Sequence, residues 1–265
     1  MAGQSISERA LQACADRLFV ARREKKPVPP LSAEFGLGDP EQAYAVQDRN
    51  TRRWLQEGRR LVGRKIGLTS RAVQQQLGVN EPDYGMLWGD MTFSEADEIA
   101  AARFMQPRVE VEIAFVMERE VTATDTSLAE LIGAIAYALP AVEIVDSAIA
   151  DWKITLADTI ADNASGGGNL LGIHPRAVKE SDLRLCGMLL TQNGRTAATG
   201  LGAACLGHPL NAVLWLARKM AEVGRPLQAG DLVLSGALGP MIAAGAGDCF
   251  TVEIQGFAPF TWRLG

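Results

Sequence analysis

Pro107-Arg-Val-Glu-Val-Glu-Ile-Ala-Phe-Val-Met117 decides the fold, because it reads as a buried β-strand that carries two acids. Side chains alternate between the two faces of a strand, so Glu110 and Glu112 project to one side and the apolar residues between them to the other. Two neighbouring carboxylates in an apolar strand repel each other and are costly to bury. A bound cation or a shared proton would remove that cost.

A third acid lies in similar surroundings, because Pro140-Ala-Val-Glu-Ile-Val-Asp146 is another β-branched run with Glu143 at its centre. We expect Glu110, Glu112 and Glu143 to converge. Three carboxylates without a nearby Cys or His form an oxygen-only site, which suits Mg²⁺ or Mn²⁺ and argues against zinc. From these residues alone, acids that face solvent on one-sided antiparallel strands are an equally good interpretation.

The composition is that of a globular protein with a substantial core: 265 residues, 48% hydrophobic and 22% charged. The net charge of −5 and the scattered basic residues argue against nucleic acid as a partner. The four cysteines are far apart with no CxxC pair, which is typical of a reduced, cytoplasmic chain. We find no secretion signal and no apolar run of transmembrane length, so we expect no membrane association.

The first part of the chain reads as helical. Residues 5–23 have one apolar face, with Ser5 or Ser7 as the candidate N-cap. Asp39-Pro40 is a cap followed by proline at the first helical position, and that helix can continue to Gly58. We therefore predict a helical N-terminal section over residues 1–58, followed by the part of the chain that carries the three acids, over residues 59–265.

The middle of the chain alternates between strand and turn signals. Residues 61–68 form a strand-like run broken by glycines, which allow close backbone approach. A short helix is predicted over Ala72 to Leu77, and residues 80–85 read as a loop that contributes Asp83. The capping box Ser127-Leu-Ala-Glu130 opens a helix that we expect to run to about Leu139, where Pro140 closes it.

The second half is rich in strands and glycine turns. Residues 158–165 precede three glycines and read either as a ligand-binding loop or as a connector. Asn193-Gly194 predicts a hairpin with a type I′ turn, and His208-Pro209 begins an apolar-striped helix. Two further strands are expected over 231–235 and 250–255. We predict an α+β fold with a mixed or antiparallel sheet core.

Several motifs, in order along the chain, closely resemble those of the 2-hydroxypentadienoate (2-keto-4-pentenoate) hydratases of the fumarylacetoacetate hydrolase superfamily. The motifs are Val62-Gly-Arg-Lys-Ile-Gly-Leu-Thr69, Glu81-Pro-Asp-Tyr-Gly85, Pro107-Arg-Val-Glu-Val-Glu112, Pro140-Ala-Val-Glu143, Asp162-Asn-Ala-Ser165, Leu206-Gly-His-Pro209 and Ser235-Gly-Ala-Leu-Gly-Pro240. The resemblance runs from about residue 8 to the C-terminus, which makes it far more specific than any single motif.

The resemblance implies a mixed β-roll core of the fumarylacetoacetate hydrolase C-terminal-domain type, with a helical N-terminal section over residues 1–58 and a metal-binding catalytic β-roll domain over residues 59–265. It implies a divalent metal, Mg²⁺ or Mn²⁺, and homo-oligomers built on pentamers. It also implies a place in the meta-cleavage degradation of aromatic compounds, where association with neighbouring pathway enzymes is a further expectation. The positions that match the family's functional residues are Glu110, Glu112 and Glu143 for the metal, Lys65 and Asp83 for catalysis, and Ser165 near the substrate carboxylate.

Without the resemblance, Lys65 would read as a surface lysine, Asp83 as a turn residue beside Pro82, and Ser165 as loop polarity. With it, the expected reaction is the addition of water to 2-hydroxypenta-2,4-dienoate. The alternatives are a decarboxylase of oxalocrotonate-type substrates and a hydratase for a longer 2-hydroxydienoate. An alternative of another class is a non-catalytic protein that only stabilises a pathway enzyme.

Overall fold

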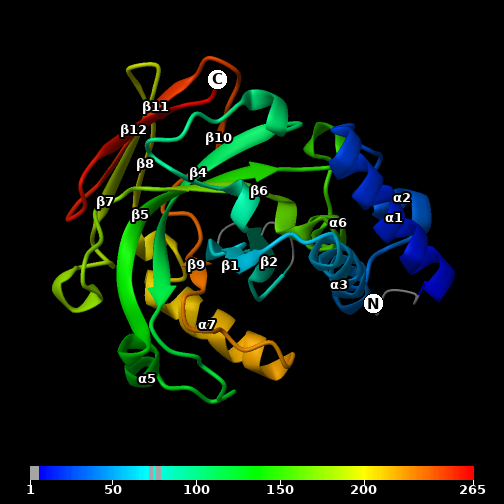
Figure 1. Cartoon of the computed structure of the whole chain (residues 1–265), viewed down its shortest axis with the longest axis horizontal. Helices are drawn as coiled ribbons and strands as arrows, with labels where there is room; N and C mark the ends of the chain where they lie inside the picture. Colours follow the sequence, from blue (N-terminus) through cyan, green and yellow to red (C-terminus); the bar gives the residue numbers. More distant parts are fainter. Residues whose placement is uncertain (1–5, 72–73, 76–78) are drawn as a thin grey trace.

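The computed structural model describes residues 6–71, 74–75 and 79–265. Figure 1 shows the N-terminal helices gathered on one side of the molecule, the helices Leu128–Gly133 and Pro209–Glu222 at its lower edge, and the β-strands over the rest. The α-helices are α1 (Glu8–Glu24), α2 (Leu31–Phe35), α3 (Pro40–Gln56), α5 (Leu128–Gly133), α6 (Leu156–Ala161) and α7 (Pro209–Glu222). Short 3₁₀ turns are η1 (Gly89–Met91), η2 (Ala101–Arg103), η3 (Ala150–Trp152), η4 (Asn163–Ser165), η5 (Val178–Glu180) and η6 (Gly202–Ala204).

The strands form one large mixed sheet and one smaller antiparallel sheet. They are β1 (Leu61–Gly67), β2 (Asp83–Trp88), β3 (Thr92–Ser94), β4 (Pro107–Met117), β5 (Ile135–Asp146), β6 (Gly166–Leu171), β7 (Gly187–Gln192), β8 (Arg195–Leu201), β9 (Leu232–Leu234), β10 (Ile242–Ala243), β11 (Cys249–Ile254) and β12 (Phe260–Arg263). Within the described residues the large sheet has the order β2-β1-β9-β4-β5-β6-β3, with β10 on β4, and the small sheet has the order β12-β11-β7-β8. The β1–β9 and β3–β6 pairs are parallel and the others antiparallel, so the predicted mixed α+β core is confirmed.

The long strands β4 and β5 form the centre of the large sheet because both are rich in β-branched and aromatic residues. Their antiparallel register places Val109 opposite Ile144 and Phe115 opposite Ala138, and all four residues are buried. The apolar face of this pair belongs to the main hydrophobic core, which helix α7 joins through Val213 and neighbouring residues. The opposite face of the pair carries the acids.

The N-terminal helices begin at the predicted residues. Ser7 caps α1 by accepting a hydrogen bond from the N–H of Ala10, and Asp39 caps α3 by accepting one from Gln42. Together with α6, these helices enclose a second apolar cluster that includes Leu18, among other buried residues. The short helix α2 was not predicted. It ends at Phe35, and its C-cap residue Gly36 has a φ of 74°, a left-handed conformation that glycine adopts without strain.

Two sequence predictions in the middle of the chain are wrong. The Ser127–Glu130 capping box does open a helix, but α5 ends at Gly133, and β5 includes the residues expected to continue that helix to Leu139. Pro140 lies inside this strand instead of closing a helix. The Pro140 carbonyl accepts from the N–H of Gly172 at 2.9 Å. The nitrogen and the carbonyl of one residue point to the same side of an antiparallel strand, so the Pro140 nitrogen, which has no hydrogen to donate, also faces Gly172, one residue beyond the end of β6.

The predicted loop over residues 80–85 is also shorter than expected, because Asp83 is the first residue of β2 and pairs with Gly67 of β1. The predicted helix over Ala72 to Leu77 lies largely outside the described residues. The Asn193-Gly194 hairpin and the α7 helix after His208 are confirmed, with Asn193 and Gly194 both at positive φ.

A substitution at Gly63 tests the parallel pairing of β1 with β9. A Cβ at this position would lie 1.8 Å from the Leu232 carbonyl oxygen, so Gly63→Ala must displace the β9 backbone. We expect a loss of about 3 kcal/mol in the free energy of unfolding, measured by urea denaturation. Gly187→Ala is the matched control, because a Cβ there meets nothing within 4 Å, and its stability should stay within about 1 kcal/mol of the parent. Equal stability of the two variants would contradict the β1–β9 contact.

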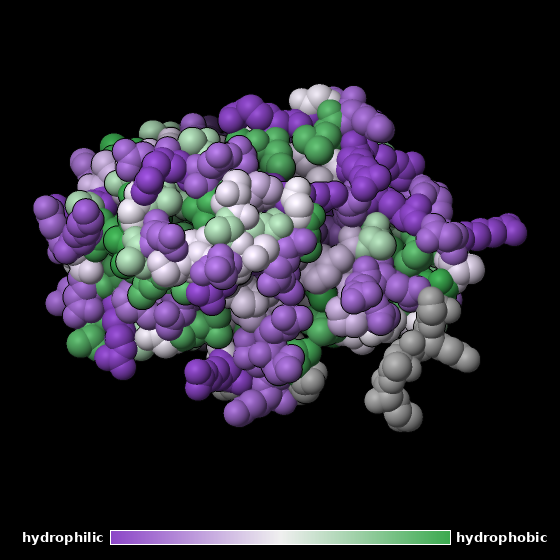
Figure 2. All heavy atoms as spheres, turned by 90° about the horizontal axis from the view of Figure 1, so that it is seen from below, coloured by the Kyte–Doolittle hydropathy of each residue, from purple (hydrophilic) through white to green (hydrophobic). Residues whose placement is uncertain are grey.

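Hydrophilic residues cover most of the face seen in Figure 2, with smaller hydrophobic patches between them. Within the described part of the chain, no helix has the length and apolar character needed to cross a lipid bilayer.

Candidate functional site

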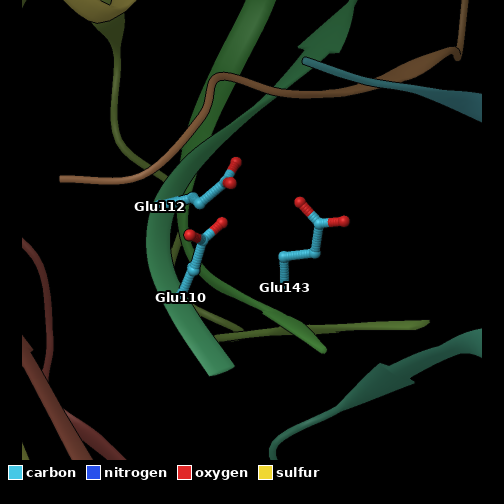
Figure 3. Close-up of side chains that lie close together, drawn as sticks. All are labelled: Glu110, Glu112 and Glu143. Carbon is cyan, nitrogen blue, oxygen red and sulfur yellow. The ribbon is translucent and has the colours of Figure 1, made fainter. Parts of the chain in front are cut away.

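The three glutamates converge on one face of the β4–β5 pair. Glu110 and Glu112 are two residues apart on β4, and the register places Glu143 of β5 directly opposite Glu110. One carboxylate oxygen from each residue lies within 4.8 Å of the other two. Figure 3 shows Glu110 and Glu112 projecting from one strand, with the Glu143 carboxylate facing the same space.

Burial makes this arrangement costly without a cation. Glu112 is 0% exposed and Glu143 is 1% exposed. Burial, followed by repulsion from Glu143, raises the pKa of Glu110 to about 7, and the same two causes raise the pKa of Glu112 well above its usual value. Glu112 Oε2 accepts from the N–H of Gly236 at 2.7 Å, but Glu112 Oε1 and Glu143 Oε2 have no hydrogen-bond partner among the described residues. Buried, unpartnered, all-oxygen donors at this spacing fit a hard divalent cation.

Lys65 reaches the acids from β1. It is 3% exposed, and its Nζ lies 3.1 Å from Glu143 Oε1 and donates to the Ala164 carbonyl at 2.9 Å. Burial alone would lower the pKa of this ammonium, but Glu143 and then Asp83 outweigh that effect and raise it. Lys65 is therefore a fixed, charged donor beside the acids.

Asp83 lies next to Lys65 at the start of β2. It is 2% exposed, and its Oδ1 has no hydrogen-bond partner among the described residues. Burial raises the pKa of this carboxyl, against the opposing effect of the Lys65 charge. The residue opposite Asp83 on β1, at position 67, must be glycine, because a Cβ there would lie 2.1 Å from Asp83 Oδ1. A buried carboxyl with a raised pKa and a free oxygen can accept and return a proton.

Ser165 lies in the η4 turn, where it is 2% exposed and its Oγ lies 3.1 Å from Thr159 Oγ1. Three consecutive non-glycine residues of this turn have left-handed backbone angles: φ is 58° at Asn163, 51° at Ala164 and 52° at Ser165. Such angles are strained and persist only where the surroundings fix them. Here they aim the Ala164 carbonyl at Lys65 Nζ.

The Asn163 side chain fixes the turn. Its Oδ1 accepts from the N–H of Met86 at 2.7 Å, and its Nδ2 donates to the Met86 carbonyl at 3.0 Å, so the amide pairs with β2 as a strand would. Close approach at Gly85 makes this possible, because a Cβ there would lie 2.4 Å from the Asn163 carbonyl oxygen. The sequence suggested nothing more than loop polarity at Asn163, although its position between a helix signal and three glycines was visible.

The metal-free protein should lose stability as the pH rises from about 5 to about 8. A carboxyl whose folded pKa is raised holds more protons when folded, so the stability it provides is present below its unfolded pKa near 4.5 and is lost as the pH passes its folded value of about 7. For Glu110 the loss is on the order of 3 kcal/mol. Melting temperatures of chelator-treated protein across this range measure it.

Glu110→Gln is the control for this pH effect, because glutamine cannot titrate, and its melting temperature should decline less over the same range. Added Mg²⁺ should stabilise the parent more at pH 8 than at pH 5, since protons compete with the cation. A metal-free parent that is equally stable at both pH values would contradict the burial of these carboxyls.

Comparison with known proteins places the chain in a family. The model for the fumarylacetoacetate (FAA) hydrolase C-terminal family matches residues 47–264. The TodF product hydratase of Pseudomonas putida is 53% identical over 252 residues, which cover 95% of this chain and 94% of that protein. The 2-keto-4-pentenoate hydratase 1 of Dechloromonas aromatica is 50% identical over 245 residues, covering 92% and 93%.

Among solved structures, 4-oxalocrotonate decarboxylase from Pseudomonas putida G7, complexed with magnesium and adipate, has a TM-score of 0.94 and 30% identity. The match covers 99% of this chain and 100% of that one. The sequence and structural similarities agree over nearly the whole chain. The protein belongs to the fumarylacetoacetate hydrolase family and, within it, to the group of the 2-keto-4-pentenoate hydratases.

Proposed function

We propose that this protein is a metal-dependent hydro-lyase that adds water to 2-hydroxypenta-2,4-dienoate and yields 4-hydroxy-2-oxopentanoate, in the meta-cleavage degradation of aromatic compounds. One observation carries the proposal: the chain is 50% identical over more than nine tenths of its length to a named 2-keto-4-pentenoate hydratase. The convergence of three glutamates, of which Glu112 and Glu143 are buried and Glu110 is half-buried, supports it.

In this proposal, Glu110, Glu112 and Glu143 hold the divalent cation. When bound, the cation supplies Lewis-acid stabilisation of negative charge on the substrate's C2 oxygen. The similar decarboxylase is solved with magnesium and also with calcium, which supports a hard divalent cation such as Mg²⁺ or Mn²⁺ here. Lys65, fixed between Glu143 and the Ala164 carbonyl, keeps its ammonium directed at the substrate carboxylate or C2 oxygen. Ser165, whose Oγ is buried beside Thr159, contacts the same carboxylate in this proposal.

Asp83 moves the protons of the reaction. The dienol takes up a proton at C5 and loses its hydroxyl proton, which gives an α,β-unsaturated 2-oxo acid. Water then adds at C4 while a proton goes to C3, so the product contains one water more than the substrate. The raised pKa and the unpartnered Oδ1 of Asp83 suit a group that must be protonated at one step and ionised at the next.

The alternative with a specific observation behind it is decarboxylation of an oxalocrotonate-type substrate, because the similar solved structure is that of a decarboxylase. Its identity of 30% is well below the 53% and 50% of the two hydratases, so hydration is the better supported reaction. A hydratase acting on a longer 2-hydroxydienoate would use the same chemistry.

The deciding experiment is an assay of metal-stripped protein with freshly generated 2-hydroxypenta-2,4-dienoate, before and after adding Mg²⁺ or Mn²⁺. Metal-restored loss of dienol absorbance, with 4-hydroxy-2-oxopentanoate as the product, is expected. Carbon dioxide release from the dicarboxylate, without turnover of the dienol, would replace the proposal with the decarboxylase.

The proposal extends to the organisation of the protein. Residues 1–58 form the helical N-terminal section, and residues 59–265 form the catalytic domain. The chain assembles into a cytoplasmic homo-oligomer built on pentamers and can associate with neighbouring pathway enzymes. Analytical ultracentrifugation measures the subunit number.

A further inference from the structure

A backbone N–H fixes one carboxylate oxygen of Glu112, a proposed metal ligand. Glu112 Oε2 accepts from the Gly236 N–H at 2.7 Å, and Oε1 has no hydrogen-bond partner among the residues that the structure describes. Because Glu112 is 0% exposed, this N–H decides which of the two oxygens is left for a cation. The position of Glu112 therefore depends on how firmly the Ser235–Gly236 peptide group is itself held.

A buried thiol holds the other end of that peptide group. Cys205 Sγ donates to the Ser235 carbonyl at 3.0 Å, and both residues are 0% exposed. The Ser235 carbonyl and the Gly236 N–H belong to one planar unit, so a donor on the oxygen also fixes the direction of the N–H. Hydrogen bonds linked in this way polarise and strengthen one another. The contacts form a chain from the thiol, through the peptide group, to the Glu112 carboxylate.

The Cys205 thiol carries the proton that this chain requires. Burial, followed by the charge of Glu112, raises the pKa of Cys205 to about 12, against the opposing effects of the Thr69 and Ser235 side chains. At neutral pH the sulfur is therefore a thiol, which can donate to a carbonyl oxygen.

The motif Leu206-Gly-His-Pro209, to which the proposed mechanism gives no role, places this thiol. The N–H of His208, the N-cap of α7, donates to the Cys205 carbonyl at 2.9 Å. The Leu206 N–H donates to the Thr69 carbonyl at 3.0 Å. The backbone at Cys205 is thus fixed between the start of α7 and the segment that follows β1.

Two further contacts hold the Ser235–Gly236 peptide group. The Ser235 N–H donates at 3.1 Å to the carbonyl of Ile113, the residue next to Glu112 on β4. A Cβ at position 236 would lie 2.3 Å from Thr69 Oγ1, so Thr69 lies directly against this glycine. These contacts limit how far the peptide group can turn, and the Cys205 thiol is the side chain that acts on its oxygen.

We propose that Cys205 is a positioning residue for metal binding: through the Ser235–Gly236 peptide group, its thiol keeps Glu112 turned so that Oε1 is left for the cation. The inference rests on the proposed function, in which Glu112 binds a divalent metal. Direct partners of a metal ligand change the metal affinity by about ten- to a hundredfold, and the Gly236 N–H is such a partner. Cys205 acts one peptide group further out, so we expect a smaller effect, of about three- to tenfold.

Calorimetric titration of the metal-stripped, full-length protein with Mg²⁺ tests the proposal. Cys205→Ala removes the donor and should weaken Mg²⁺ binding about three- to tenfold. Cys205→Ser keeps a donor beside the same carbonyl and should restore most of the affinity. Cys186→Ala is the matched control, because this thiol is 3% exposed and also donates to a backbone carbonyl, that of Leu183 at 3.3 Å. It should keep the parental Mg²⁺ affinity.

Hydrogen exchange of the metal-free protein is a second measurement, which does not depend on the cation. In Cys205→Ala the Gly236 amide should exchange several-fold faster than in the parent, because the peptide group has lost the donor on its oxygen. The Leu238 amide of the same segment, which donates to the Val111 carbonyl at 2.9 Å, should keep its parental rate. Mass spectrometry with fragmentation to single residues measures both rates.

Unchanged Mg²⁺ affinity or unchanged exchange at Gly236 in Cys205→Ala would overturn the proposal. So would an equal loss of Mg²⁺ affinity in Cys186→Ala, which would assign the effect to a general loss of stability. A parent protein that binds no Mg²⁺ would overturn the proposed function instead, and the exchange rate at Gly236 would still decide whether the thiol fixes Glu112.

Discussion

Replacing Glu143 by glutamine is expected to abolish metal binding and turnover together. Glutamine keeps the size of the side chain but removes the charge that a divalent cation requires. The change also deprives the Lys65 ammonium, 3.1 Å away, of its nearest carboxylate. Because Lewis-acid stabilisation is worth several kcal/mol, we expect turnover to fall by about a thousandfold or more. Calorimetric titration with Mg²⁺ and the dienol assay on the same preparation measure both losses.

Glu253→Gln is the matched control, since Glu253 lies exposed on β11 and is not among the three converging acids. It should bind metal and turn over as the parent does. A Glu143→Gln protein with parental activity and parental Mg²⁺ affinity would remove Glu143 from the metal site. Melting curves of both variants show whether a loss comes from the site or from unfolding.

Asp83→Asn is expected to have the opposite signature: the protein keeps its metal and loses turnover. Asparagine fits the same space beside Gly67 but cannot exchange the proton that the proposed mechanism assigns to this carboxyl. Loss of a general acid or base lowers the rate by about a hundred- to ten-thousandfold. Single-turnover kinetics at saturating Mg²⁺ and substrate measure this loss without interference from binding.

The same change at Asp125, an exposed residue before the α5 cap, is the control and should leave turnover unchanged. If Asp83→Asn retained parental turnover, Asp83 would not move the protons, and Lys65 would become the first candidate. If Asp83→Asn lost its metal as well, the carboxyl would act mainly on the electrostatics of the three glutamates.

The convergence of the acids could be predicted because two local rules are enough. The period of two in β4 puts Glu110 and Glu112 on one face, and the β-branched surroundings of Glu143 indicate a neighbouring strand. The register that places Glu143 opposite Glu110 is set by the whole sheet. Sequence spacing alone left this open, and solvent-facing acids were an equally good interpretation.

The errors around Pro140 and Asp83 have a common cause. Proline and turn-forming residues usually end strands, so their local preference pointed to a helix stop and to a loop. In the folded chain, the Pro140 nitrogen, which cannot donate a hydrogen bond, lies opposite a residue beyond the end of β6. Asp83 begins a strand that pairs with β1. Whether such residues interrupt a strand depends on neighbours that are distant in sequence.

Backbone groups of the site were beyond prediction for another reason. The Ala164 carbonyl that holds Lys65 and the Gly236 N–H that holds Glu112 exist at every residue, so side-chain patterns carry no trace of them. Asn163 has a distinctive side chain, but its role depends on Met86, which is 77 residues away.

In the left-handed η4 turn, the stability of the fold and the position of the Lys65 ammonium make opposite demands on the sequence. Each of its three strained residues costs on the order of 1 kcal/mol, and glycine at position 164 would relieve part of that strain. The same change would also widen the range of backbone angles open to residue 164, whose carbonyl fixes the Lys65 ammonium. If Lys65 acts as proposed, selection for heat resistance alone would favour a less active protein here, and thermostabilising libraries should leave residues 163–165 unchanged.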